Sequence, residues 1–179
     1  MRKLKTSIGK KSGGEFAVEQ DTLLIHIHGG GFIATTTQSH QSYARVWANN
    51  LPNAVVFSID YRMAPKHKFP DAVDDCWQAY VWIIKNAQRT FGINYKKVVV
   101  TGDSAGGSLS ITLTLMAINR NFRAPDAIMT SYPSTISCVE AFWPSLLGAV
   151  DDPVLAQSYL GLIQRAYCPE NDPFIGSRN

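Results

Sequence analysis

The sequence predicts an α/β fold in which helices cover a mostly parallel sheet. Short aliphatic and β-branched segments alternate along the chain with longer segments of helical periodicity. Strands and helices that alternate at this spacing form right-handed crossovers, which place the strands parallel. The composition agrees, because 45% hydrophobic and 17% charged residues over 179 positions are typical of one globular domain with a sizeable core.

The first half of the chain contains two expected strands and two expected helices. Thr22–His28 and Ala54–Asp60 are short, mostly apolar strands, and Ser39–Asn50 between them has helical character. A longer helix opens at Asp71 and ends at Gly92, since glycine favours a helix C-terminus. Its apolar stripe follows the i, i+3, i+4, i+7 spacing and consists of Val73, Cys76, Trp77, Tyr80, Ile84 and Ala87.

The second half continues the alternation. Lys97–Thr101 is a β-branched strand, and the helix Ala105–Asn121 follows it at once. Ala127–Ser131 is a further strand. A last helix starts at Pro153, because proline is favoured in the first turn of a helix, and it runs through Tyr167.

The net charge of +3 lies in the first 20 residues. Residues 1–20 carry five basic and two acidic side chains, whereas residues 21–179 carry twelve of each. We therefore divide the chain into a basic polar tail (1–20), an α/β core (21–145) and a helical segment (146–179). A solvated tail is the simplest interpretation, and peripheral contact with an anionic lipid surface stays open. No nucleic-acid partner is expected, because no aromatic residues alternate with the lysines.

The cysteines indicate a reducing compartment. Cys76, Cys138 and Cys168 are odd in number, show no C-x-x-C spacing, and accompany no N-x-[ST] sequon. The chain also has no apolar run of the roughly 18 residues that a membrane span needs, and no signal-peptide pattern at its start. We expect a cytoplasmic location.

The run GDSAGG at residues 102–107 fits G-x-S-x-G and falls between an expected strand and an expected helix. This motif places a serine on a strained strand-to-helix turn, where the flanking glycines let neighbouring backbone pass. Ser104 would then be exposed at the sheet edge, with the Ala105 N–H at a helix N-terminus that stabilises an oxyanion. A flexible Gly/Ser loop would not explain this position, and no phosphate-binding glycine motif is present.

A second glycine run, HGGGF at residues 28–32, follows an earlier strand. Three glycines let the backbone approach a ligand closely and turn N–H groups toward it, as in the second half of an oxyanion hole. By itself the run would also fit a plain turn. Its pairing with the serine motif favours the functional interpretation.

In order along the chain, these motifs resemble the hormone-sensitive lipase family of α/β hydrolases. The resemblance covers about residues 22–179 and includes DYRMAP at residues 60–65, Phe69-Pro70 and Tyr132-Pro133. The segment 146–167, with its DDPVL run, is similar to the animal-type members rather than the bacterial esterases.

The resemblance implies an α/β-hydrolase fold and a serine carboxylic-ester hydrolase that needs no cofactor or metal. Ser104 would be the nucleophile, and the N–H groups of Gly30, Gly31 and Ala105 would form the oxyanion hole. The residues implied as supports of this hole and of the serine turn are His28, Gly29 and Asp103. The expected substrates are acylglycerols or other lipid esters if the animal-type resemblance holds, and short-chain esters otherwise.

The catalytic acid and base of the family have no counterpart in this sequence. The family places them C-terminal to the serine, in D-P-x-x-D and H-G-F runs, yet the 75 residues after Ser104 contain no histidine. His28 belongs to the glycine loop, and His26 points to the same side of its strand. His40 and His67 suit surface or cap positions, and a metal site at His26-x-His28 lacks a third ligand.

The family fold also has elements before the HGGGF strand that the basic tail does not supply. The resemblance therefore predicts that the fold is incomplete at both ends and that the chain is a fragment, inactive alone, of a longer hydrolase. A natural truncation is the alternative. A second functional hypothesis is a small-molecule-binding protein without turnover, because the plant gibberellin receptors resemble the same family. Oligomeric state is left open.

Overall fold

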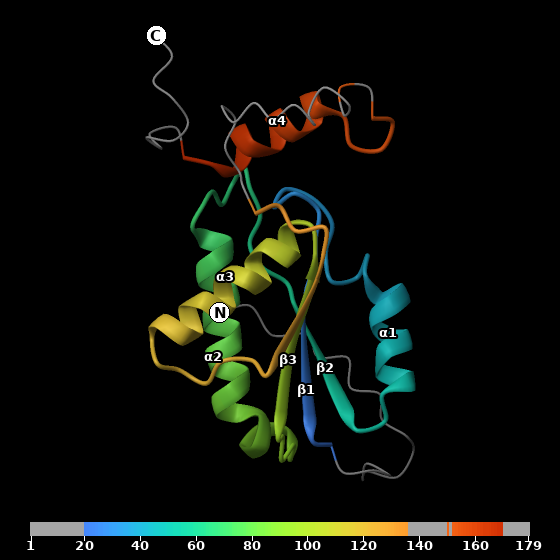
Figure 1. Cartoon of the computed structure of the whole chain (residues 1–179), viewed down its shortest axis with the longest axis vertical. Coiled ribbons are helices and arrows are strands. Elements are labelled where there is room, and N and C mark those ends of the chain that lie inside the picture. Colours follow the sequence, from blue (N-terminus) through green and yellow to red (C-terminus); the bar gives the residue numbers. More distant parts are fainter. Residues whose placement is uncertain (1–19, 136–149, 151, 170–179) are drawn as a thin grey trace.

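The computed structural model describes residues 20–135, 150 and 152–169. Its four strands are β1 (Thr22–Ile27), β2 (Ala54–Ile59), β3 (Lys97–Asp103) and β4 (Ala127–Ser131). They form one sheet in the order β2-β1-β3-β4, and every neighbouring pair is parallel (Figure 1). The predicted parallel α/β fold is confirmed.

The strand register brings the two glycine motifs to one edge of the sheet. Ile27, the last residue of β1, pairs with Gly102 of β3. Both strands run in the same direction, so the HGGGF loop and the GDSAGG turn leave the sheet side by side. In parallel α/β sheets this carboxyl edge is where ligands bind.

Four helices of the described residues pack around the sheet. They are α1 (Gln41–Asn50), α2 (Asp71–Phe91), α3 (Ala105–Asn119) and α4 (Gln157–Tyr167). Figure 1 shows α1 on one face of the sheet and α2 with α3 on the other, while α4 lies across the carboxyl ends of the strands. β1 therefore lies inside the molecule, with five of its six residues buried.

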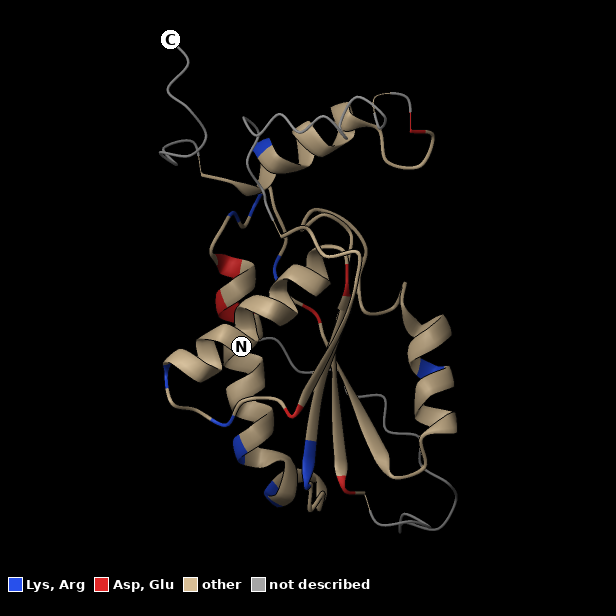
Figure 2. Cartoon of the chain, in the orientation of Figure 1, with Lys and Arg blue, Asp and Glu red and all other residues tan. Residues whose placement is uncertain are grey.

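The longest helix, α2, packs on the sheet through a buried stripe, and its terminal charges suit the helix dipole. Cys76, Tyr80 and Ala87 are buried as expected. Val73, Trp77 and Ile84 are partly buried and pack against the core, and Ile83, which was not expected in the stripe, is fully buried. Figure 2 shows acidic residues at the N-terminal end of α2 and basic residues at its C-terminal end, the distribution that a helix dipole favours.

The strand and helix bounds agree with the expected ones to within two residues, except at the start of the last helix. The last helix begins at Gln157 rather than Pro153, because the Asp152 carboxylate accepts N–H bonds from Val154 and Leu155 (2.8 Å each) and holds a turn there. Gln20, assigned to the tail, is buried, and its side-chain amide donates to the Pro52 carbonyl (2.7 Å).

Some expectations lie outside the described residues. They concern the basic residues of 1–19, the start of the 146–179 segment and its last ten residues, and Cys138. In the part of the chain that is described, no helix combines the length and apolar character of a membrane span.

Candidate active site

Ser104 occupies a strained turn between β3 and α3. Its φ of 50° and ψ of −119° lie in a region that residues with a Cβ rarely adopt. Such strain persists only where the surroundings hold it, and it is concentrated at functional sites. Here the Ser104 N–H donates to the Ser131 carbonyl on β4 (2.9 Å), which ties the turn to the edge of the sheet.

The glycines on either side of Ser104 are required by close packing against β1. A Cβ added to Gly106 would lie 2.6 Å from the His28 carbonyl oxygen, and nearer still to that of Ile27. A Cβ added to Gly102 would lie 2.7 Å from the same Ile27 oxygen. The first turn of α3 can therefore sit against the end of β1 only because both positions lack a side chain.

The loop after β1, residues 28–35, turns back on itself beside this elbow. Gly30 has a φ of 107° and Gly31 a φ of 61°, both in the left-handed region. The Gly30 carbonyl accepts the N–H groups of Ile33 (3.2 Å) and Ala34 (2.9 Å), which closes a tight turn. This geometry fits a loop whose amides are available to a ligand.

Backbone groups of this loop are held by neighbouring elements. The Gly29 N–H donates to Asp103 Oδ1 (3.1 Å), and the His28 carbonyl accepts the Tyr61 hydroxyl (2.9 Å). The Phe32 carbonyl accepts the Ala64 N–H (2.9 Å). The GDSAGG turn and the DYRMAP segment thus fix the position of the glycine loop.

His28 is fully buried and supports the loop rather than facing Ser104. Its ring stacks on Tyr61 (4.3 Å between centroids, 11° between planes), and its Nδ1–H donates to the Gly29 carbonyl (2.8 Å). Its Nε2, 3.8 Å from Asp60 Oδ1, has no hydrogen-bond partner among the described residues. Burial lowers the pKa of His28, so the ring is held in its neutral form.

The other histidines are also hydrogen-bonded to groups other than Ser104. His26 bonds Ser58 and Tyr43, His40 bonds the Thr36 carbonyl, and His67 bonds Asp71. Among the described residues, no histidine is hydrogen-bonded to Ser104, and no three His, Cys, Asp or Glu side chains gather to hold a metal ion.

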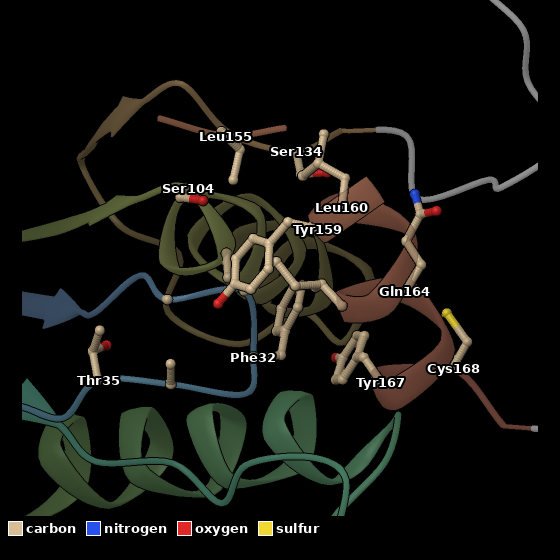
Figure 3. A pocket seen from close by; sticks show the side chains of 15 residues that line it. Phe32, Thr35, Ser104, Ser134, Leu155, Tyr159, Leu160, Gln164, Tyr167 and Cys168 are labelled. Carbon is tan, nitrogen blue, oxygen red and sulfur yellow. The ribbon is translucent and has the colours of Figure 1, made fainter. Parts of the chain in front are cut away.

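A cavity of about 240 Å³ joins the serine turn, the glycine loop and α4. Figure 3 shows Ser104 and Thr35 on one side of it and side chains of α4 on the other. Four of the expected site residues, Gly30, Gly31, Ser104 and Ala105, line this cavity. Its other walls are mainly apolar, with Phe32, Ala34, Leu155, Tyr159, Leu160, Ile163 and Tyr167 among them.

The contribution of α4 to this cavity was not expected from the sequence. The Tyr167 ring stacks on Phe32 (3.9 Å, 6°), and its carbonyl accepts the Phe69 N–H (2.8 Å). Ile163 lies so close to Gly31 that a Cβ there would be 2.7 Å from its Cδ1. The apolar spacing of Leu160, Ile163 and Tyr167 was the available signal for a face turned toward other elements.

Comparisons with known proteins agree with this geometry. Residues 24–174 match the sequence model of a protein family that has the alpha/beta hydrolase fold. The chain is 43% identical to hormone-sensitive lipase of Mus musculus over 145 residues, which are 81% of this chain and 19% of that lipase. Esterase LipI of Mycobacterium tuberculosis is 32% identical over 84% of the chain and 46% of its own length.

The chain belongs to the hormone-sensitive lipase family of α/β hydrolases. Solved structures of ester hydrolases are similar over most of the chain. The esterase of Pyrobaculum calidifontis has a TM-score of 0.77 and 31% identity over 88% of this chain and 52% of its own. An ester hydrolase from the Lake Arreo metagenome, complexed with a bipyridine phosphonate derivative, has a TM-score of 0.78 and 29% identity over 90% and 53%. The chain thus spans about half the length of these esterases and about a fifth of the mammalian lipase.

Proposed function

We propose that this protein is a serine carboxylic-ester hydrolase with Ser104 as its nucleophile. One observation carries the proposal: a serine strained at φ 50° lines an apolar cavity together with a loop of left-handed glycines. The N–H groups of Gly30, Gly31 and Ala105 are the donors for the oxyanion. Ala105 is the first residue of α3, so the positive end of the helix dipole also stabilises the oxyanion.

The reaction proceeds through an acyl-enzyme. Ser104 Oγ attacks the ester carbonyl carbon while its proton passes to a general base, and the oxyanion that forms is bound by the three amides. The C–O bond to the alcohol breaks as the base returns the proton, and water then hydrolyses the acyl-serine by the same route. We assign the base to a histidine, with its acid partner, outside these 179 residues, since none follows Ser104.

Lipid esters are the proposed substrates. The apolar side chains of Phe32, Leu160 and Ile163 in the cavity wall suit an acyl chain, and a mammalian lipase is among the relatives. The chemistry needs neither a cofactor nor a metal. A cytoplasmic location and peripheral contact with a lipid surface stay predictions, supported by the reduced thiol of Cys76 and by the charge of residues 1–20.

Ligand binding without turnover is the second candidate. The observation that favours it is the engagement of His26, His28 and His40 with partners other than Ser104. Without a positioned base, the serine hydroxyl is a weak nucleophile, and the cavity would serve for binding only.

A covalent probe separates the two. Protein expressed from its complete reading frame is treated with a fluorophosphonate, and hydrolysis of p-nitrophenyl butyrate is measured in parallel. We expect stoichiometric labelling at Ser104 and loss of both signals in Ser104→Ala, with ester binding retained. Labelling at another serine would refute the assignment, and an unlabelled protein that still binds esters would favour the binding function.

A further inference from the structure

A chain of side-chain hydrogen bonds runs behind Ser104 on the α1 face of the sheet. Ser58 Oγ bonds His26 Nδ1 (2.8 Å), and His26 Nε2 bonds the Tyr43 hydroxyl (2.9 Å). The Tyr43 hydroxyl in turn donates to Asp103 Oδ1 (3.2 Å), the residue immediately before Ser104. This chain of hydrogen bonds joins four separate elements, β2, β1, α1 and β3.

The direction of each hydrogen bond follows from the carboxylate at its end. An ionised Asp103 only accepts, so Tyr43 must use its single proton there. The Tyr43 oxygen then accepts from His26 Nε2–H, which leaves Nδ1 to accept the Ser58 hydroxyl proton. The opposite tautomer of His26 would claim the Tyr43 proton and place two acceptor oxygens 3.2 Å apart.

His26 is suited to hold this direction because it stays neutral. It is 1% exposed, and burial, with a smaller effect of His40, lowers its pKa to about 4. A neutral imidazole has one donor and one acceptor, which is what a chain with one direction requires.

Asp103 connects this chain of hydrogen bonds to the glycine loop. The oxygen that accepts the Tyr43 proton also accepts the Gly29 N–H (3.1 Å). Gly29 packs so closely on this residue that a Cβ would lie 2.7 Å from the Asp103 carbonyl oxygen and nearer still to Oδ2. The orientation of the carboxylate therefore determines where the loop begins, one residue before Gly30.

The carboxylate has room to turn if Tyr43 does not hold it. A second cavity, of about 260 Å³, opens beside Asp103 and is lined by Tyr43, His40, Trp47 and Tyr132 among others. The Asp103 side chain is 24% exposed, and His40 Nε2 lies 3.8 Å from Asp103 Oδ1, beyond hydrogen-bond distance.

We propose that Tyr43 is a positioning residue for ester hydrolysis: its hydroxyl, oriented by His26 and Ser58, holds the Asp103 carboxylate on the Gly29 N–H, so that Gly30 and Gly31 keep their amides on the oxyanion formed at Ser104. The proposal rests on the proposed function. It assigns a role in catalysis to α1, which contributes no residue to the cavity that contains Ser104.

The test is Tyr43→Phe in protein expressed from its complete reading frame, with Tyr80→Phe as the matched control. Tyr80 is buried on α2, on the opposite face of the sheet from α1, and its hydroxyl donates to the Arg123 carbonyl (2.6 Å). Both variants lose a bond that a tyrosine hydroxyl donates, but only Tyr43→Phe loses the bond to Asp103, together with the bond that Tyr43 accepts from His26.

For Tyr43→Phe we expect kcat to fall about tenfold with KM within about twofold, less than the hundredfold or more that removal of a direct oxyanion donor costs. The inhibition constant of a trifluoromethyl ketone, whose adduct places an oxyanion in the same hole, should rise by a similar factor. Tyr80→Phe should leave both constants unchanged.

Hydrogen exchange of the Gly29 amide gives a readout that needs no activity. It should accelerate about tenfold in Tyr43→Phe and not in Tyr80→Phe, because the released carboxylate no longer binds that N–H. Equal exchange in both variants would overturn the proposal, and so would a change in KM alone. A wild-type protein that neither hydrolyses nor labels would instead refute the proposed function.

Discussion

Acidification should destabilise the fold through His26. In the unfolded chain this imidazole takes up a proton near its ordinary pKa of 6.5, whereas in the folded state burial lowers the pKa to about 4. Between these values the unfolded state binds more protons, so the free energy of unfolding rises with pH. The contribution of neutral His26 is complete above pH 6.5 and is lost as the pH falls toward 4.

The size of the effect follows from the two pKa values. At about 1.4 kcal/mol per pH unit, the full difference is about 3 kcal/mol, and most of it, about 2.5 kcal/mol, is lost by pH 4.5. Such a loss is a large share of the 5–15 kcal/mol that is typical of domains. The side chain is 1% exposed, so solvent does little to reduce it.

The assay compares urea unfolding of the wild type and of His26→Gln from pH 7.5 to 4.5. Carboxylates titrate in the same range, but they contribute equally to both proteins, so the difference between the two free energies isolates His26. As the pH falls from 7.5 to 4.5, we expect the free energy of unfolding of the wild type to decrease by about 2.5 kcal/mol more than that of His26→Gln. A difference that stays constant with pH, or a His26 pKa near 6.5 by NMR titration, would refute the reasoning.

Four further predictions concern the site and the tail. Gly106→Ala should abolish activity and lower stability by about 1–3 kcal/mol, because the new Cβ meets the backbone at the end of β1; unchanged activity would mean that α3 need not touch β1. Tyr167→Ala should lower the free energy of unfolding, measured with urea, by about 3 kcal/mol and reduce kcat, because the stack on Phe32 is lost. An unaltered kcat would show that α4 does not hold the glycine loop. Deleting residues 1–19 should leave the unfolding transition cooperative and weaken binding to anionic liposomes, as five basic side chains are removed; loss of the transition would place these residues in the fold. The 179-residue chain by itself should hydrolyse p-nitrophenyl butyrate no faster than its Ser104→Ala variant, because no base is positioned; faster turnover would identify one of its own histidines as the base.

Local patterns predicted most elements of the fold. β1, β2, β3 and β4 lie where β-branched and aliphatic runs end at polar or glycine residues, and α2 ends at Gly92, whose φ of 69° suits a glycine. The start of α4 was wrong, because Pro153 is acceptable both in a first helical turn and in the turn that Asp152 holds. Such a choice depends on one side-chain hydrogen bond, which a propensity does not reveal.

By itself the sequence determined the order of strands and helices, the serine turn and the glycine loop. All of these depend on contacts within a few residues, on helical or strand periodicity, and on glycines where a Cβ does not fit. Only the tertiary structure decided which distant groups meet. Gly29 and Asp103, which are hydrogen-bonded, lie 74 positions apart. His26 of β1 is hydrogen-bonded to Tyr43 of α1. The Tyr167 ring, near the end of the chain, stacks on Phe32. These contacts depend on strand register and on how α1 and α4 pack, which are set by the whole core. Periodicity can show that a helix such as α4 has an apolar face, but not which residues that face meets.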